Sequence, residues 1–233
     1  MRGVARRGEA GRGRARRGVA RQGGAGLGEA GQGMVQFNSK EIHMKRIQVE
    51  IQGTSPLLIH RFGEAEQTEK TTRRVRVAEN YDPREEATKH AYIAPNGTFY
   101  FSAFAIPNAM GNAGASHKQK GSRKTLRYVV PSAVRMESDT VTIMNGSGAA
   151  KDFEIDSRPV TIPATQGRVM RHRPRFNCWS AQFILLVNDD MLDPQTAHQL
   201  LNEAGQSIGI GDFRPEKRGP FGTFLVTKFA EAK

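Results

Sequence analysis

The sequence predicts a single α+β domain over residues 44–233, preceded by a tail over residues 1–43 that does not fold. Three observations support this prediction. Ile47, Val49 and Ile51 alternate with polar residues, which is the period of a half-buried strand. Downstream of Asp193 the apolar residues recur at helical spacing. An alternating run at 223–229 then predicts a closing strand.

The tail is rich in glycine and arginine. Residues 1–33 contain eleven Gly, eight Arg and two Glu, but neither Lys nor an aromatic residue. Such a segment cannot bury enough apolar surface to become ordered. Two interpretations follow. Either the tail grips phosphates as an RGG-like arm, or the gene start is over-called and Met34 or Met44 is the initiator in place of Met1. We favour the second.

Charge and cysteine content restrict the partners of the protein. The net charge is +12, of which the tail contributes +6, so the domain itself retains +6. A basic surface attracts polyanions, above all nucleic acid. The single cysteine, Cys178, excludes an internal disulfide framework and a zinc site with several thiolates. No apolar stretch is long enough to span a membrane and no signal peptide is evident, so we expect a cytoplasmic protein. We also expect neither a cofactor nor a metal.

In the first half of the domain, the sequence predicts two strands, an insertion, a hairpin and a helix. The strand that begins near Met44 is followed by a short apolar run at 57–59. The mixed-charge segment Glu64–Glu86 is predicted to be a mobile insertion. Asn96-Gly97 between strand-like runs predicts a tight hairpin. A proline then opens a short helix over 108–116.

The second half predicts a series of strands and one helix. Short apolar runs predict strands at Val129–Val130, Ala133–Val134, Val141–Met144 and Phe153–Ile162. The clearest strand is Phe176–Val187, whose apolar centre suits a buried position in a sheet. Asp193 is predicted to cap a helix. The buried face of that helix consists of Ala197, Leu200, Leu201, Ala204 and Ile208.

Two windows of the sequence, 87–136 and 157–188, contain no acidic residue. The first window gathers its cations around Gly121, at Lys118, Lys120, Arg123, Lys124 and Arg127. The second contains Arg158, Arg168, Arg171, Arg173 and Arg175. Because no neighbouring carboxylate along the sequence neutralises these cations, we interpret them as contacts to a phosphate backbone rather than as a merely solvated surface.

Aromatic residues accompany both windows. Tyr128 lies beside the first cluster, and Phe176 and Trp179 lie beside the second. Aromatic faces next to arginine stack on unpaired bases in proteins that bind single strands. Packing in a core is the commoner fate of such residues, and we expect at least one of Phe176 and Trp179 to be buried.

A glycine-rich segment, residues 209–222, separates the predicted helix from the last strand. Its glycines allow left-handed dihedrals and the close approach of another backbone, and its N–H groups and cations can bind phosphates. The candidate contacts are Gly209, Gly211, Arg214, Lys217, Arg218, Gly219 and Gly222. The segment is neither a P-loop nor a dinucleotide fingerprint, because those motifs follow a strand and open a helix.

The sequence GIGDFRPEKRGPFGTFLV, residues 209–226, resembles the C-terminal signature of the RAMP superfamily, the RNA-binding proteins of CRISPR systems. TSPLLIHRF at 54–62 and AIPNAMGNAGAS at 105–116 are similar to segments of the family's backbone-forming subunits. The resemblance implies a ferredoxin-like, RRM-derived βαββαβ core with insertions and a C-terminal glycine-rich loop. It also implies a protein of a prokaryote or its virus that self-associates along a single-stranded guide RNA.

The leading hypothesis is a non-enzymatic module that binds single-stranded nucleic acid, RNA in preference to DNA, through its backbone. It would be a repeating subunit of a CRISPR-like or mobile-element ribonucleoprotein. A RAMP-type endoribonuclease is an alternative, with His60 as the candidate general base because some members of the family cut RNA with a histidine near the glycine loop. A structural or assembly protein of a phage or mobile element is a third. We interpret Asp189, Asp190 and Asp193 as turn and cap residues.

Overall fold

A computed structural model describes residues 44–62, 82–146, 148–161 and 167–232. All of them belong to one compact unit, Glu41–Lys233. The predicted disordered tail lies outside the described residues, and so does most of the predicted mobile insertion, residues 64–81.

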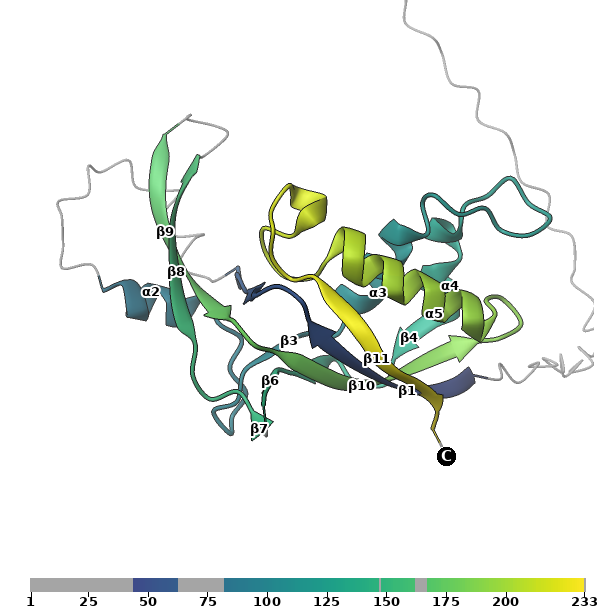
Figure 1. The fold of residues 1–233 in the computed structure, drawn as a ribbon, viewed down its shortest axis with the longest axis horizontal. Helices are drawn as coiled ribbons and strands as arrows, with labels where there is room; N and C mark the ends of the chain where they lie inside the picture. The colour runs from purple at the N-terminus through teal and green to yellow at the C-terminus, as the bar shows by residue number, and fades with distance from the viewer. Residues whose placement is uncertain (1–43, 63–81, 147, 162–166, 233) are drawn as a thin grey trace, which may run out of the picture. The chain divides into compact units, whose positions relative to one another are not determined.

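An antiparallel sheet forms the centre of the fold (Figure 1). Its main strands are β1 (Met44–Gly53), β4 (Val134–Met136), β10 (Ser180–Asn188) and β11 (Phe224–Glu231). β1 lies between β10 and β11, and β4 pairs with β10. The short strands β6 (Met144–Asn145) and β7 (Gly148–Ala149) continue the sheet from the other end of β10. The strands predicted from Met44 and over 223–229 are therefore confirmed.

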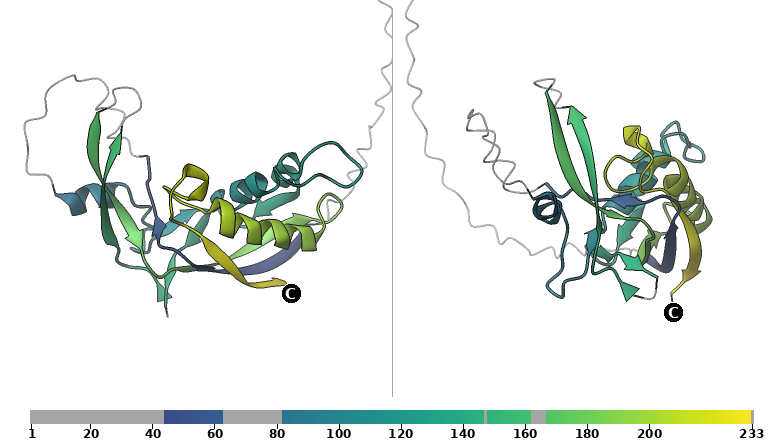
Figure 2. Two further views of the ribbon diagram at one scale, coloured as in Figure 1. Left: turned by 45° about the horizontal axis from the view of Figure 1, so that its top comes forward. Right: turned by 60° about the vertical axis from the view of Figure 1, so that its left-hand side comes forward.

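Helices cover one face of this sheet (Figures 1 and 2). They are α3 (Ala105–Ala113), α4 (Val130–Ala133) and α5 (Pro194–Glu203), with the 3-10 turn η2 (Leu126–Tyr128) before α4 and the π-helical turn η3 (Ala204–Ile208) after α5. The carboxylate of Asp193 caps α5 as predicted, because it accepts from the backbone N–H groups of Gln195 and Thr196 at 3.0 and 3.2 Å.

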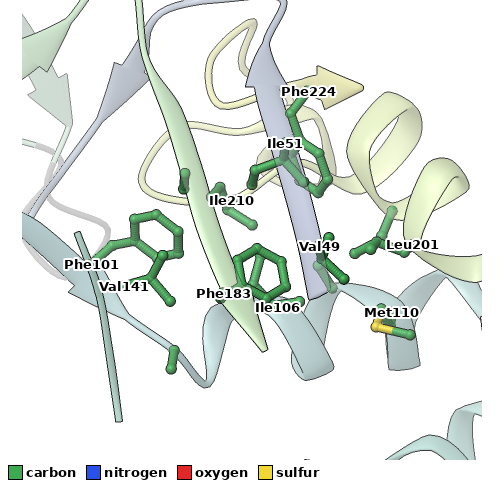
Figure 3. Close-up of a cluster of buried hydrophobic side chains, with 14 of the residues drawn as sticks. Val49, Ile51, Phe101, Ile106, Met110, Val141, Phe183, Leu201, Ile210 and Phe224 are labelled. Carbon is green, nitrogen blue, oxygen red and sulfur yellow. The ribbon is translucent and has the colours of Figure 1, made fainter. Parts of the chain in front are cut away.

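The core lies between the sheet and these helices (Figure 3). Val49 and Phe183 oppose each other on β1 and β10, and they pack with Ile106 of α3 and Leu201 of α5. Each of these side chains is at least nine-tenths buried, which removes about 25 cal/mol of unfavourable hydration per Å² of apolar surface. Along the chain, the main elements around this core are β1, α3, β4, β10, α5 and β11, in the order strand, helix, strand, strand, helix, strand. The predicted α+β class is confirmed.

A second, three-stranded sheet consists of β2 (Leu57–Leu58), β9 (Arg168–Phe176) and β8 (Glu154–Thr161), in that order. β8 and β9 form a long hairpin that projects from the central sheet (Figure 2). Helix α2 (Pro83–Lys89) packs on the hairpin. The guanidinium of Arg84 bonds the Asp152 carboxylate at 2.5 Å and lies over the Phe153 ring. This bond holds the pKa of Asp152 below its usual value and ties α2 to the start of β8.

A third pair of strands, β3 (Tyr100–Ser102) and β5 (Thr140–Thr142), lies beside these sheets. The predicted hairpin at Asn96-Gly97 precedes β3 and is confirmed. Ile93 and Phe99 form a bridge across it, and Gly97 adopts φ +78°, a value that favours glycine.

The prediction of one strand over Phe176–Val187 is wrong. β9 ends at Phe176, the chain turns through the exposed Asn177 and Cys178, and β10 begins at Ser180 in a different sheet. Trp179 holds this turn, because its indole N–H donates to the Ser55 carbonyl at 2.8 Å and its ring packs against the backbone of Gly53. The apolar alternation continued across two separate elements and concealed the turn.

Three further predictions differ from the structure. Val129–Val130 is not a strand: Val129 follows η2 and Val130 is the first residue of α4, where its burial outweighs the β-propensity of valine. The last residues of the predicted insertion, from Pro83, form the start of α2, and the Asp82 carboxylate caps this helix by accepting from the Arg84 N–H. The predicted helix over 108–116 begins earlier, at Ala105, and ends at Ala113.

Candidate nucleic-acid interface

The first cationic cluster lies in an exposed segment that follows α3 and ends in η2, which we call the basic loop (residues 118–127). It closes through the Lys118–Thr125 bridge and a hydrogen bond from the Gln119 N–H to the Lys124 carbonyl at 2.9 Å, and Gly121 takes φ +75° at its tip. All five predicted cations, Lys118, Lys120, Arg123, Lys124 and Arg127, are exposed. Among the residues that the structure describes, none of the five forms an ion pair.

Tyr128 stands next to the basic loop with 72% of its surface exposed. At the other end of the loop the imidazole of His117 contacts the Glu203 carboxylate of α5 at 2.6 Å. The loop is therefore attached to the helical layer at its start, and its cations and one aromatic ring face solvent. An exposed ring beside several cations is the arrangement that single-strand-binding surfaces use.

The second cationic cluster lies on the β8–β9 hairpin and differs from the first. Arg168 is exposed, but Arg171 contacts the Glu86 carboxylate of α2 at 3.8 Å. Arg173 is 9% exposed and pairs with Asp212 of the glycine loop at 3.0 Å. Carboxylates from distant segments thus neutralise cations that appear unopposed along the sequence.

Two other arginines of the hairpin contact an aromatic ring. The guanidinium groups of Arg158 and Arg175 lie 4.7 and 6.0 Å from the centre of the Phe221 ring. Arg158 also pairs with Asp156 at 2.8 Å. These contacts join the hairpin to the glycine loop, so Arg158, Arg173 and Arg175 hold these two segments together.

The glycine loop (Gly209–Gly222) folds on itself. Gly209, Gly211 and Gly222 take φ values of +71°, +77° and +72°. A Cβ on Gly222 would overlap the Ile210 carbonyl oxygen, and a Cβ on Gly219 would overlap that of Phe213. At Gly219 and Gly222 the close approach is therefore made by the loop's own backbone, and at Gly211 it is made by the Leu58 carbonyl.

Most N–H groups of the glycine loop bond within the protein. Ile210 N–H donates to the Gly222 carbonyl at 2.9 Å, Asp212 N–H to Leu58 at 2.7 Å, and Gly222 N–H to Pro56 at 2.8 Å. These amides are not available to phosphates, contrary to the expectation from the sequence. Lys217 and Arg218 are exposed, whereas Arg214 is held by Glu216 at 2.6 Å and by the Gly211 carbonyl at 2.9 Å.

Phe176 and Trp179 are 4% and 1% exposed. Both belong to the core, which confirms the expectation that at least one of them is buried. Their rings pack on other aromatic rings, with Phe176 5.4 Å from Phe99 and Trp179 6.3 Å from Phe224, measured between ring centres. Neither ring is accessible to a base.

A pocket of about 410 Å³, which the sequence did not indicate, lies between the glycine loop and α3. One face of α3, from Ala105 to Asn112, forms one wall, and the glycine loop from Gly209 to Glu216 forms another. Ile59, His60, Tyr92 and Phe104, together with Phe101 and Ser102 of β3, complete it. Its lining comes from segments far apart along the chain, so no local motif could reveal it.

His60, the candidate general base, lies in the wall of this pocket. Its ring stacks on that of His90 with 4.3 Å between the centres.

Asp193 caps a helix as predicted, and Asp189 pairs with Lys45 at 3.2 Å. Across the described segments, no group of three or more His, Cys, Asp or Glu side chains is placed to hold a metal ion. None of the helices in those segments is long and apolar enough to cross a membrane.

We expect the Arg173–Asp212 pair to stabilise the fold. In Asp212→Asn, the nearly buried guanidinium of Arg173 loses its counter-charge, and the free energy of unfolding should fall by about 2 kcal/mol. Urea denaturation measures this change. The matched control is Glu137→Gln, which removes the carboxylate from the exposed Arg46–Glu137 pair. It should lower the free energy of unfolding by less than about 1 kcal/mol. Equal losses in the two variants would contradict the assignment.

No family model matches the sequence, and no curated protein matches it. Among solved structures, a chain of the Type III-B Cmr-beta bound to cognate target RNA aligns with a TM-score of 0.49 and 10% identity, over 82% of this chain and 62% of that chain. Cmr6 from Pyrococcus furiosus aligns with a TM-score of 0.43 and 10% identity, over 78% of this chain and 98% of that chain. This chain spans less than two thirds of the first structure's length. We therefore base the function on the residues of this chain.

Proposed function

We propose that this chain binds single-stranded nucleic acid, RNA in preference to DNA, through contacts to the phosphates and without cleaving it. The observation that carries the proposal is the basic loop, whose five exposed cations have no ion-pair partner among the described residues. Cations without a protein counter-charge can neutralise phosphates and release the ions condensed on a nucleic acid. We add the exposed Arg168, Lys217 and Arg218 to these contacts.

The preference for single strands rests on Tyr128. Its exposed ring directly follows Arg127 in the basic loop, so a base next to a bound phosphate can stack on it. Bases in a duplex are already stacked on each other and do not offer a free face. We further propose that several copies coat one strand, as expected for a RAMP-like subunit of a CRISPR-like or mobile-element ribonucleoprotein.

Removing two cations of the basic loop should weaken binding and its dependence on salt. In the double variant Lys120→Ala/Lys124→Ala, each lost phosphate contact should lower the slope of log K against log salt by about 0.7, the value for single strands. The slope should therefore fall by about 1.4. Fluorescence anisotropy of the full chain with labelled single-stranded RNA across a salt series measures it.

The matched control is Lys89→Ala/Lys228→Ala, which removes the same charge from two lysines that pair with Glu85 and Glu50. This variant should keep the slope of the unmodified protein. If both double variants lower the slope equally, only net charge matters and the basic loop is not the contact. Repeating the series with single-stranded DNA and duplex RNA tests the preference, since equal affinity for all three would overturn it.

An endoribonuclease is the second candidate, because His60 lies in the wall of the pocket beside the glycine loop. Incubation of labelled RNA with the protein and with His60→Ala distinguishes the two functions. Cleavage that disappears in the variant would establish the enzyme. Intact RNA after binding by both proteins supports the binding module. Oligomers that form without nucleic acid, with no salt-sensitive binding, would instead indicate an assembly protein.

A further inference from the structure

We infer that the pocket between α3 and the glycine loop holds one unstacked base of the bound strand, and that it selects bases that carry an amino group. This inference rests on the proposed function and adds a site for the base to the contacts with the phosphates. A volume of about 410 Å³ lies in the range of pockets that hold small ligands.

One side of the pocket is aromatic. Phe104, the residue before α3, is 63% exposed at the rim, and Tyr92 and Phe101 also contribute to the lining. An exposed phenylalanine leaves apolar surface in water, and a stacked base would cover it. Every base has a π-face, so this side explains affinity for a base without selecting among bases.

The other side is polar and has no excess of positive charge. The Asp212 carboxylate pairs with Arg173, and the Glu216 carboxylate accepts from Arg214 at 2.6 Å and from the Asn112 amide at 3.1 Å. Two carboxylates balance two guanidinium groups, so a phosphate would find no net attraction there. A neutral base does not depend on such an attraction and can bind there through hydrogen bonds.

The carboxylates also account for the selection. Each carboxylate oxygen can accept two hydrogen bonds, so Asp212 and Glu216 retain acceptor capacity beyond the bonds that fix them. A base amino group is a donor that suits this capacity, as in the pairing of acidic side chains with cytosine. Guanine, adenine and cytosine carry an amino group and uracil does not. The pocket should therefore discriminate against uracil.

The position of the pocket suits a strand held by its phosphates. Lys217 and Arg218, both exposed, directly follow Glu216, and the basic loop begins at Lys118, shortly after the end of α3 at Ala113. A strand bound by Lys217 and Arg218 lies next to Glu216, which belongs to the wall of the pocket. One base can therefore turn inward while the phosphates stay at the surface.

The test compares short strands of uridine that differ at one central position. The guest position carries uridine, guanosine, adenosine, cytidine or no base, and anisotropy measures the affinity of the full chain for each strand. We expect the strands with an amino-bearing guest to bind about tenfold more tightly than the all-uridine strand, as for one good base contact. In Phe104→Ala the guest base loses the ring on which it stacks and is no longer held against Asp212 and Glu216, so this ratio should fall to about one.

Tyr128→Ala is the matched control, since it removes another exposed aromatic ring outside the pocket. It should weaken all strands alike and keep the tenfold ratio. Glu216→Gln supplies an amide donor in place of an acceptor and should shift the preference towards uridine. Equal affinity for all guests, or a preference that persists in Phe104→Ala, would overturn the inference while leaving the proposed function in place. Loss of salt-sensitive binding to every strand would overturn the proposed function itself.

Discussion

Replacing Trp179 with alanine should lower the free energy of unfolding by about 3–5 kcal/mol, which is the usual cost of removing a buried tryptophan. The side chain is 1% exposed and packs between Phe101 and Phe224 at centre distances of 6.5 and 6.3 Å. Its removal also leaves the Ser55 carbonyl without the indole donor. Urea denaturation followed by far-UV circular dichroism measures the loss, because the variant has no tryptophan fluorescence.

Tyr128→Ala provides the comparison for an exposed ring, and its free energy of unfolding should change by less than about 0.5 kcal/mol. Trp179→Phe should lie between the two, since it keeps a ring but loses the donor to Ser55. If Trp179→Ala is as stable as Tyr128→Ala, the indole is not part of the core. The sole tryptophan would then again be a candidate for stacking on bases.

Gly222→Ala should be the most disruptive substitution in the glycine loop, with a loss of about 2–5 kcal/mol in the free energy of unfolding. Two costs combine. An L-residue at φ +72° costs about 1–2 kcal/mol, and overlap of the new Cβ with the Ile210 carbonyl adds about 1–3 kcal/mol. Denaturation midpoints and slopes of the two proteins give the difference.

Gly121→Ala isolates the first of these costs. Gly121 takes φ +75°, almost the same as Gly222, but a Cβ added to Gly121 would meet no atom within 4 Å beyond its chain neighbours. This variant should lose only about 1–2 kcal/mol. Similar losses in the two variants would show that the glycine loop has room to adapt. It would then be a flexible loop rather than one held together by its own carbonyls.

Local patterns in the sequence predicted the elements that are determined by local physics. The alternation at Ile47, Val49 and Ile51 marks a strand with one buried face, and the Asp193 cap marks the start of α5. The same patterns failed at a turn that is stabilised by contacts with a residue distant in the sequence. Trp179 ends the apparent strand over 176–187 through a hydrogen bond to Ser55, far back along the chain.

In the candidate site too, the sequence predicted the features that depend on local residues and missed those that depend on contacts between distant segments. The basic loop is cationic and exposed because its sequence has no carboxylate and few apolar residues, and both properties are visible locally. The cations of the hairpin were misleading because Glu86 and Asp212, which neutralise Arg171 and Arg173, come from other parts of the chain. The pocket was invisible for the same reason, since α3 and the glycine loop meet only in the folded protein.

The pairing of β1 with β11 has a consequence for the synthesis of the protein. Ile47 lies opposite Glu231, so β1 finds one of its two neighbours among residues that are translated long after it. Its other neighbour, β10, is also translated late. Until then the apolar row of β1 and both its edges remain unprotected on the nascent chain, which exposes the protein to aggregation and slows its folding. Folding of the central sheet should therefore begin only after β11 has been translated.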